Sequence, residues 1–490
     1  MVWRNTVPSA LLRSGRPAGV ALRLAIIAIV TLLGGCASSS APDGGLRNDH
    51  CSAQWRSIQG ELRAQGIRDA QAVPVPAAPY LRVTRQLGDF NLDELTPEQR
   101  LEWLERALSE GMAGLSSEVS RLASAPELTG LQGCARREIE LMAYDDRRWK
   151  QMAETVAVPD AYRQWRRYVG LFPLFRPFMQ MQVNRLEAHL ESQYGDYEAE
   201  GQWQRYRPAP PQEESVDVAA IIDRAGERSS LGLYWFTDQE RQQLLAYHAP
   251  VLEVETQGSH DQPGSPQWRN DRWEISPPVR VYTQISAMRW RNGWVPQLVY
   301  HFWFDERPRD TFPGLYGGRL DGLIWRVTLD RDGDVLMYDS VHPCGCYLKW
   351  HPVEARLELR PERPDDGIMT LMPVSRPPAD ARPLVRLQSG THYVVDILYS
   401  EADGKEGEGY EMAPYNALRS ITDHGITRSL FGPEGIVPGT QRLERFLLWN
   451  TGAVSPGAMR QWGHHATSFI GTRHFDSPDL LQRYFAPRAP

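Results

Sequence analysis

Four common signatures of catalysis are absent from this sequence. It contains no HExxH zinc motif, no GxSxG nucleophile elbow, no SxxK pair and no phosphate-binding loop. Ser-His-Asp chemistry therefore has no motif support. Lysine is also scarce, with only three residues in the chain, and the formal net charge is −7. This balance argues against a nucleic-acid partner, which requires a basic face.

Long hydrophobic runs are missing as well. The longest run extends from Leu24 to Leu33, which is ten residues, whereas a membrane-spanning helix needs ~20. The N-terminus before this run is free of acidic residues and carries four arginines, and small residues follow the run. This order is that of a secretory signal peptide. We therefore assign residues 1–35 to such a signal.

The end of this run reads Leu33-Gly34-Gly35-Cys36, which resembles the lipobox of bacterial lipoproteins. The resemblance implies cleavage before Cys36, which then becomes the first mature residue and carries the acyl chains. Such chains anchor a protein without a spanning helix. Ala37 replaces the aspartate that favours the inner membrane in that family, so the resemblance implies a lipid anchor in the outer membrane, on its periplasmic face. Residues 36–49 are small and polar and predict a flexible tether.

Cysteine is rare, with five residues in the chain. If Cys36 carries lipid, an even set remains in an oxidising compartment. The economical pairing joins Cys51 to Cys134 and Cys344 to Cys346. Other pairings stay open, because connectivity does not follow from sequence alone.

Helical signals dominate residues 50–205. Thr96-Pro97-Glu98-Gln99 forms a capping box that starts a helix, and apolar residues recur at helical spacing further along the chain. The Pro-rich, polar residues 206–215 predict a domain linker. A second capping box begins at Thr237 and starts a short helix.

Strand signals dominate residues 216–403. Hairpin signals at 291–293 and 330–334 connect β-rich segments and predict an antiparallel sheet. Residues 404–490 are rich in Gly and Pro and predict an irregular tail with short helices, packed on the β domain. The predicted fold class is therefore α+β, with a helical domain before a β-rich one.

The densest group of candidate ligands is His342-Pro343-Cys344-Gly345-Cys346, with His351 nearby. A disulfide between the two cysteines is the favoured interpretation, because Gly345 lets the backbone bend and the compartment is oxidising. A site for a soft divalent or cuprous ion, with His342 or His351 as an added ligand, is the second interpretation. A reactive thiol is the third. We expect no cofactor unless the second interpretation holds.

A further polar group comprises His464, His465, His474 and Asp476. One histidine could act as a general base with Asp476 orienting it. Packed histidines whose ring nitrogens bond to the backbone are the favoured interpretation.

Two segments, from Tyr316 to Asp330 and from Tyr338 to Tyr347, resemble a family of large proteobacterial lipoproteins. The resemblance extends through Gly463-His464-His465-Ala466-Thr467. No activity is assigned to that family, so the resemblance implies location rather than chemistry. Leu348 stands where the family has a histidine after Cys-Gly-Cys-Tyr, which weakens a metal site that needs a ligand there.

These features predict an outer-membrane-anchored periplasmic lipoprotein with a binding or scaffolding role in the cell envelope. Its partners would be the membrane, through the lipid on Cys36, and an envelope protein or cell-wall ligand. The alternative is a metal- or thiol-dependent envelope enzyme centred on His342, Cys344 and Cys346. The sequence does not decide whether the chain is an enzyme.

Overall fold

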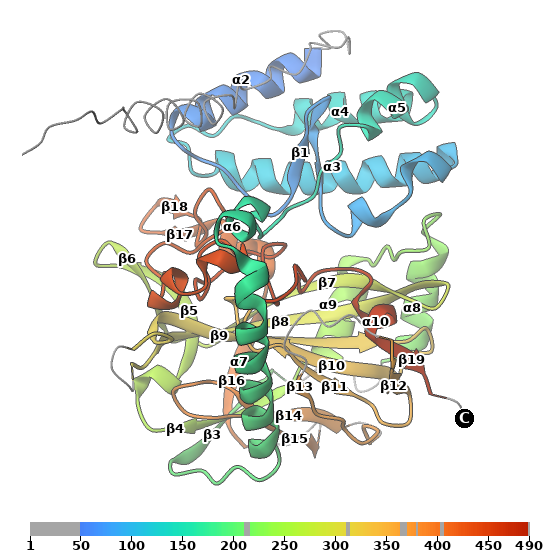
Figure 1. Ribbon diagram of the computed structural model, residues 1–490. Coiled ribbons are helices and arrows are strands. Elements are labelled where there is room, and N and C mark those ends of the chain that lie inside the picture. The colour runs from blue at the N-terminus through green and yellow to red at the C-terminus, as the bar shows by residue number, and fades with distance from the viewer. Residues whose placement is uncertain are drawn as a thin grey trace, which may run out of the picture. The chain divides into compact units, whose positions relative to one another are not determined.

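The computed structural model describes residues 50–209, 216–309, 314–362, 370–378, 381–401 and 406–488. The predicted signal peptide, Cys36 and the predicted tether lie outside the described residues. Residues 50–490 form a single compact unit. Figure 1 shows this unit as a group of helices beside a large sheet.

The N-terminal part of the unit is helical, as the sequence predicts. The capping box at Thr96 is present, and the helix that it starts ends at Val119. A short hairpin that the sequence did not indicate follows the first helix. The elements are α2 (His50–Ala64), β1 (Val73–Val75), β2 (Ala78–Val83), η1 (Leu87–Asp89), η2 (Leu92–Glu94), α3 (Pro97–Val119), α4 (Thr129–Ala143) and α5 (Asp146–Ala153).

The predicted disulfide between Cys51 and Cys134 is confirmed. It joins α2 to α4 with a Cα–Cα distance of 5.7 Å across 83 residues of sequence. The helices pack around buried tryptophans such as Trp55 and Trp103, and their core also contains Trp294 from the sheet. The predicted helical and β-rich domains therefore share a hydrophobic core.

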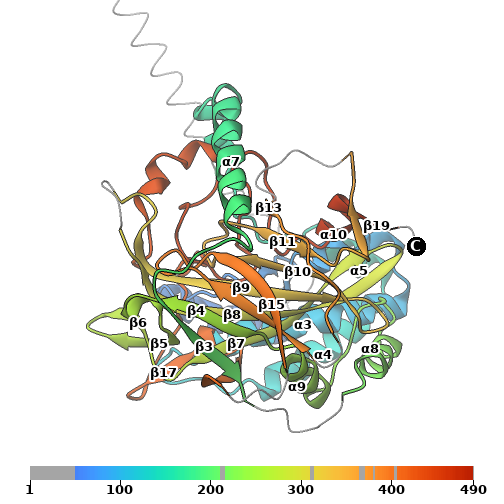
Figure 2. The same ribbon diagram turned by 90° about the horizontal axis from the view of Figure 1, so that it is seen from below.

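Two helices follow this group, α6 (Gln164–Val169) and α7 (Phe172–Gln193). Helix α7 extends away from the sheet in Figure 2. The chain then enters strand β3 (Gln202–Pro208), so residues 206–208 of the predicted linker lie in the sheet. Residues 210–215 lie outside the described residues. Two further helices come next, α8 (Val218–Glu227) and α9 (Asp238–Tyr247), and the capping box at Thr237 is confirmed.

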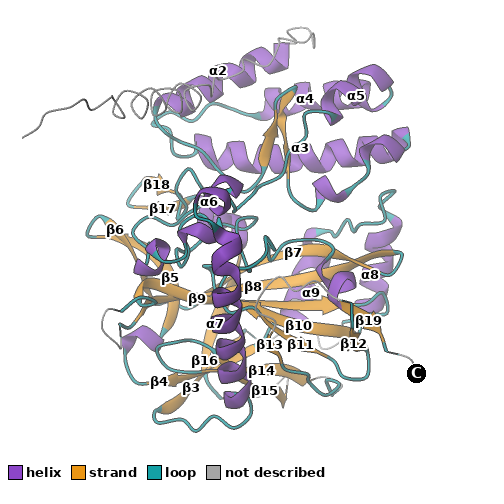
Figure 3. Cartoon of the chain, in the orientation of Figure 1, coloured by secondary structure: helices purple, strands orange, loops and turns teal. Residues whose placement is uncertain are grey.

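The main sheet has thirteen strands, and most of it runs in the order β13-β11-β10-β9-β8-β7-β16-β3-β4-β14-β15, with β5 and β6 off this path. Figure 3 shows these strands in orange. The strands not yet given are β4 (Val251–Thr256), β5 (Pro263–Arg269), β6 (Arg272–Ser276), β7 (Arg280–Trp290), β8 (Gly293–Arg307), β9 (Gly318–Leu329), β10 (Val335–Val341), β11 (Lys349–Pro352), β13 (Thr370–Leu371), β14 (Ala381–Leu387), β15 (Val394–Glu401) and β16 (Glu408–Pro414).

The antiparallel prediction holds only for part of this sheet. Strands β7 to β10 form an antiparallel meander through the two predicted hairpins. Strand β16, however, runs parallel to both β7 and β3, and β14 runs parallel to β4. The sheet is therefore mixed. Its parallel pairs join segments that are distant in sequence, and a hairpin cannot connect parallel strands.

The C-terminal residues are part of the unit rather than a separate tail. Strand β16 lies inside the sheet, and the Arg460 N–H donates to the Pro343 carbonyl at 2.9 Å. The guanidinium of Arg326 on β9 donates to the Phe475 carbonyl at 2.8 Å. The remaining elements are η3 (Ser259–Asp261), β12 (Leu357–Leu359), η4 (Tyr415–Arg419), β17 (Ile421–Asp423), β18 (Ile426–Arg428), η5 (Leu443–Phe446), η6 (Trp449–Thr451), α10 (Leu480–Tyr484) and β19 (Phe485–Pro487). None of the described helices is long and apolar enough to span a bilayer.

Candidate functional site

The Cys344-Gly345-Cys346 segment forms a tight turn just after β10. The Gly345 N–H donates to the His342 carbonyl at 2.7 Å, and the His342 N–H donates to the Cys346 carbonyl at 3.1 Å. Gly345 has φ +89°, a conformation that L side chains rarely adopt, and the backbone of Ala466 lies where its Cβ would be. Glycine is therefore required here by both conformation and space.

The predicted bridge between Cys344 and Cys346 is absent from the structure. Both side chains are buried free thiols. Backbone hydrogen bonds close the turn without a covalent link. The Cys346 N–H donates to Cys344 Sγ at 3.4 Å. Cys344 and Cys346 therefore form a dithiol without a covalent bridge.

Beside the turn lies a buried carboxylate that sequence reasoning missed. Asp321 on β9 accepts hydrogen bonds from His342 Nδ1 at 3.1 Å and from His392 Nδ1 at 2.9 Å. Arg442 Nη2 donates to the same carboxylate at 3.4 Å. Burial disfavours the charge of Asp321, but these partners outweigh it and hold the Asp321 pKa well below its usual range. Asp321 is therefore ionised at neutral pH.

The two histidines on Asp321 have pKa values shifted in opposite directions. Burial lowers the pKa of His342 to about 4, so His342 is neutral at neutral pH. The second ring nitrogen of His392 donates to the His260 carbonyl at 3.2 Å. Burial opposes protonation of His392, but Asp261 and Asp321 outweigh it and raise its pKa. His392 therefore keeps its proton to higher pH than His342 does.

The four candidate metal ligands are not brought together. His342 is occupied by Asp321, whereas His351 lies on β11 with Nδ1 donating to the Met372 carbonyl at 3.1 Å. The His351 ring stacks on Tyr194 at 5.6 Å. Within the part of the chain that the structure describes, no group of three or more His, Cys, Asp or Glu side chains is placed to hold a metal ion.

The second histidine group is dispersed. His464 donates to the Ala70 carbonyl at 2.7 Å, and His474 Nε2 accepts the Ala161 N–H at 3.1 Å. Asp476 pairs with Arg85 at 3.3 Å rather than with a histidine. His465 is fully buried next to Trp462. The backbone partners of His464 and His474 are those of packed histidines, and the arrangement contains no base with Asp476 as its orienter.

An exposed apolar surface is the largest feature that sequence reasoning missed. It gathers large side chains that soluble proteins usually bury, among them Tyr168 at 76% exposure and Leu174 at 75%. The residues of this apolar surface lie on α6, on α7 and on the turn between them (Trp165, Tyr168, Val169, Leu171, Leu174, Phe175, Phe178 and Met181), and on η5, η6 and the turn between those (Leu443, Phe446, Leu447 and Trp449). Helix α6 adjoins both α7 and η6, and exposed large apolar side chains gathered on neighbouring elements mark protein or membrane interaction sites.

Hydrogen bonds hold the two halves of the apolar surface together. The Arg163 N–H donates to the Gly452 carbonyl at 2.8 Å, and Arg167 Nη1 donates to the Thr451 carbonyl at 3.1 Å. Arg167 also lies over the Phe172 ring at 4.0 Å. The helix pair is thereby fixed to the body of the protein at its α6 end.

The charged residues of the segment 161–186, which contains α6 and the first half of α7, are all positive. Residues 161–186 contain five arginines and no aspartate or glutamate, although the whole chain has a formal net charge of −7. The arginines are Arg163, Arg166, Arg167, Arg176 and Arg185. The α6 and α7 part of the apolar surface therefore lies in a segment whose charged residues are all arginines. This absence of acids was the signal in the sequence that could have found it.

Helix α7 contributes to the core through only part of its length. Val183 and Leu190 are buried, and Leu190 belongs to the main core of the sheet, but Met181 is 41% exposed. In the first half of α7, Phe172 is buried, whereas Leu174, Phe175, Phe178 and Met181 are exposed.

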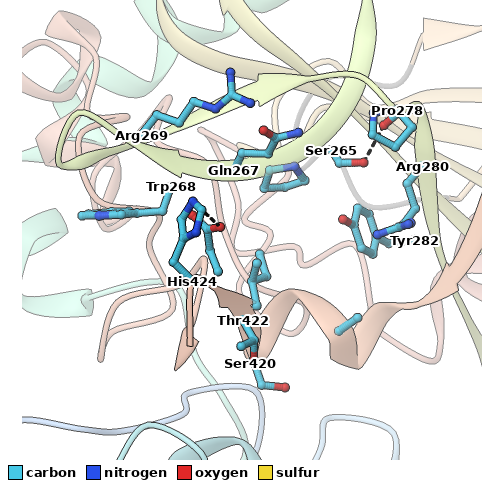
Figure 4. Close-up of a pocket in the computed structure, with 14 residues that line it drawn as sticks. Ser265, Gln267, Trp268, Arg269, Pro278, Arg280, Tyr282, Ser420, Thr422 and His424 are labelled. Atoms are coloured by element: carbon cyan, nitrogen blue, oxygen red, sulfur yellow. Dashed lines mark hydrogen bonds and ion pairs between the residues drawn. The ribbon is translucent and has the colours of Figure 1, made fainter. Parts of the chain in front are cut away.

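A pocket lies between the β5–β6 hairpin and the β17–β18 hairpin (Figure 4). Its arginine Arg280 is paired with Glu411 at 2.9 Å, and Arg428 lies over the Trp268 ring at 4.9 Å. His424 is almost fully exposed and is 3.6 Å from Asp423. The pocket thus offers an open polar rim and no buried reactive group.

Comparisons of the chain with protein-family models, with curated proteins and with solved structures gave no match. The function is therefore argued from this chain's own residues.

Proposed function

We propose that the protein is a lipid-anchored envelope protein whose apolar surface docks on an anionic membrane. The observation that carries this proposal is the exposed set of Trp, Tyr, Phe and Leu side chains on and around α6 and α7, in a segment (161–186) whose charged residues are all arginines. Docking would hold the compact unit in one orientation on the membrane and present the rest of its surface to a partner. This is a binding or scaffolding role.

The composition of the surface fits a bilayer interface. Trp and Tyr prefer the level of the lipid headgroups, where one end of the ring is apolar and the other is hydrated. Leu174 and Phe178 are large enough to reach the acyl boundary, as the apolar faces of interfacial helices do. Each arginine close to anionic lipid contributes about 1 kcal/mol of attraction.

The predicted anchor on Cys36 supports the same arrangement. The thirteen residues from 37 to 49 can span at most about 45 Å, so the body would stay close to the membrane. A tethered surface meets the bilayer at a high effective concentration, which makes even weak docking effective. Anchor and surface together provide the two signals that stable peripheral attachment needs.

Vesicle flotation tests this function. We would use residues 37–490, which lack Cys36 but contain the whole compact unit. Vesicles of phosphatidylcholine are compared with vesicles that also contain phosphatidylglycerol. The expected result is flotation with the anionic vesicles, weakened by added salt because the arginines act through charge. Absence from both kinds of vesicle, or a dimer that hides the apolar surface, would contradict lipid docking and assign the surface to a protein contact.

The alternative function is a metal- or thiol-dependent enzyme. The observation that favours its thiol form is the unbonded Cys344 and Cys346 pair beside Asp321. Elemental analysis of protein purified from the periplasm tests the metal form, which requires bound metal that is lost from a Cys344→Ser variant. Neither outcome depends on membrane binding.

A further inference from the structure

The Cys344 and Cys346 side chains form an asymmetric pair. Cys344 Sγ accepts the Cys346 N–H at 3.4 Å, and the Cys346 thiol neighbours the same sulfur. A backbone donor on this sulfur favours the thiolate form of Cys344.

Two buried arginines lie near this pair. Arg460 Nε donates to the Cys344 carbonyl at 2.9 Å, and Arg442 lies close enough to favour negative charge on Cys344. Arg442 is buried, and its Nε has no hydrogen-bond partner among the described residues. Glu444 and Asp321 are the opposing acids near the thiols. A guanidinium beside a thiolate both stabilises the anion and can bind an oxygen atom next to it.

Burial opposes ionisation of Cys344, but the hydrogen bond from Cys346 and the charge of Arg442 outweigh it and lower the Cys344 pKa. The hydrogen bond to Cys344 and burial both raise the pKa of Cys346 well above its usual range. Together with the backbone N–H that Cys344 Sγ accepts, this difference assigns Cys344 as the nucleophile and Cys346 as the thiol that keeps its proton.

We propose that Cys344 and Cys346 form a peroxide-reactive thiol pair that closes to a disulfide across Gly345. The oxidant is a small hydroperoxide. Cys344 is 1% exposed and Cys346 is 8% exposed, so burial selects against bulky disulfides and favours the smallest oxidant.

The reaction runs in two steps with balanced atoms and electrons. The Cys344 thiolate attacks one peroxide oxygen, the O–O bond breaks, and the leaving hydroxide takes the Cys346 proton to become water. The Cys346 thiolate then attacks the Cys344 sulfur, the S–O bond of the sulfenic acid breaks, and the second hydroxide takes a proton from solvent. The two thiols lose two electrons, and the peroxide is reduced to two waters.

The test uses the mature protein, reduced under conditions that leave the Cys51–Cys134 bridge closed and then freed of reductant. One equivalent of hydrogen peroxide is added, and thiols are counted while the peptide containing both cysteines is weighed. We expect both thiols to disappear, with loss of two hydrogens from that peptide, at least about tenfold faster than free cysteine reacts. Oxidised glutathione should react slowly with the same protein.

Two serine variants separate the role of Cys344 from that of Cys346. Because opposite outcomes are expected from the two variants, misfolding of one does not imitate the expected result. In Cys346→Ser the sulfenic acid on Cys344 should persist and be trapped by dimedone, whereas Cys344→Ser should leave Cys346 almost unreactive. Sulfenic acid on Cys346 in the wild type, peroxide consumption no faster than by free cysteine, or faster reaction with oxidised glutathione would each overturn the proposal.

Discussion

Asp69 and Arg419 form a buried, two-point ion pair across 350 residues of sequence. Arg419 Nε lies 2.9 Å from Asp69 Oδ2, and Arg419 Nη2 lies 2.8 Å from Asp69 Oδ1. Arg82 and Gln461 also contact Asp69, and Arg82 binds Glu118 at 2.6 Å. This network joins the helical group to η4 and the C-terminal residues, so both parts belong to one cooperative unit.

Removing one partner of this pair should destabilise the whole unit. Asp69→Asn leaves the buried Arg419 uncompensated, which costs about 3–5 kcal/mol of unfolding free energy. Urea unfolding measures the change. The matched control is Asp146→Asn, because Asp146 pairs with Arg100 but its side chain is 90% exposed, so it should cost less than about 1 kcal/mol. Equal losses for both variants would show that the Asp69 pair carries no special weight.

Loss of the disulfide should weaken the same unit. Cys51→Ala with Cys134→Ala opens a bridge that spans 83 residues, which costs about 4 kcal/mol in the chain-entropy model. The expected result is a lower urea midpoint for the double variant and for the reduced wild type. A double variant as stable as the oxidised protein would show that the bridge contributes nothing.

The reactivity of Cys344 should persist at lower pH than that of an ordinary thiol. The thiolate is the reactive form, and the Cys344 pKa is lowered. The peroxide rate constant should therefore fall with decreasing pH only below about 8.5, the usual pKa of cysteine. Stopped-flow measurement from acid to alkaline pH gives the midpoint. A midpoint at or above that of free cysteine would contradict the proposed pair.

Lys349 should make stability depend on pH. It is buried beside Tyr393, and burial lowers its pKa to about 7. The pKa of lysine in the unfolded chain is about 10.4. Between the folded and unfolded pKa values the unfolded state binds more protons, so stability rises with pH. From pH 7 to 9 the wild type should gain about 2 kcal/mol of unfolding free energy relative to Lys349→Met. Parallel pH profiles for the two proteins would disprove this prediction.

Local signals in the sequence predicted local structure well. The capping boxes at Thr96 and Thr237 both form, because a cap depends on residues three positions apart. The hairpin at Asn292 and the bridge between Cys51 and Cys134 also form. In each case the deciding contact is encoded by neighbours in the chain or by a small set of possible partners.

Long-range pairings could not be predicted in the same way. Strand β16 pairs Glu408 with Tyr206, and no periodicity relates two segments that far apart. Asp321 and His392 meet between β9 and the start of β15, where each residue alone has no distinctive neighbours. The apolar surface could not be predicted for another reason. Helical spacing shows that a helix has an apolar face, but it does not show whether another element covers that face.

Membrane partitioning of a matched pair of variants tests the central claim most directly. Leu174→Ser with Phe178→Ser removes two side chains from the apolar surface, whereas Leu141→Ser with Ile426→Ser removes two similarly exposed side chains elsewhere. Partition coefficients on phosphatidylglycerol-containing vesicles are measured for both, beside the wild type. The account predicts at least about a tenfold loss for the first variant, because each side chain contributes ~1.5–3 kcal/mol when buried, and no change for the second. Equal partitioning of all three proteins would contradict docking through the apolar surface.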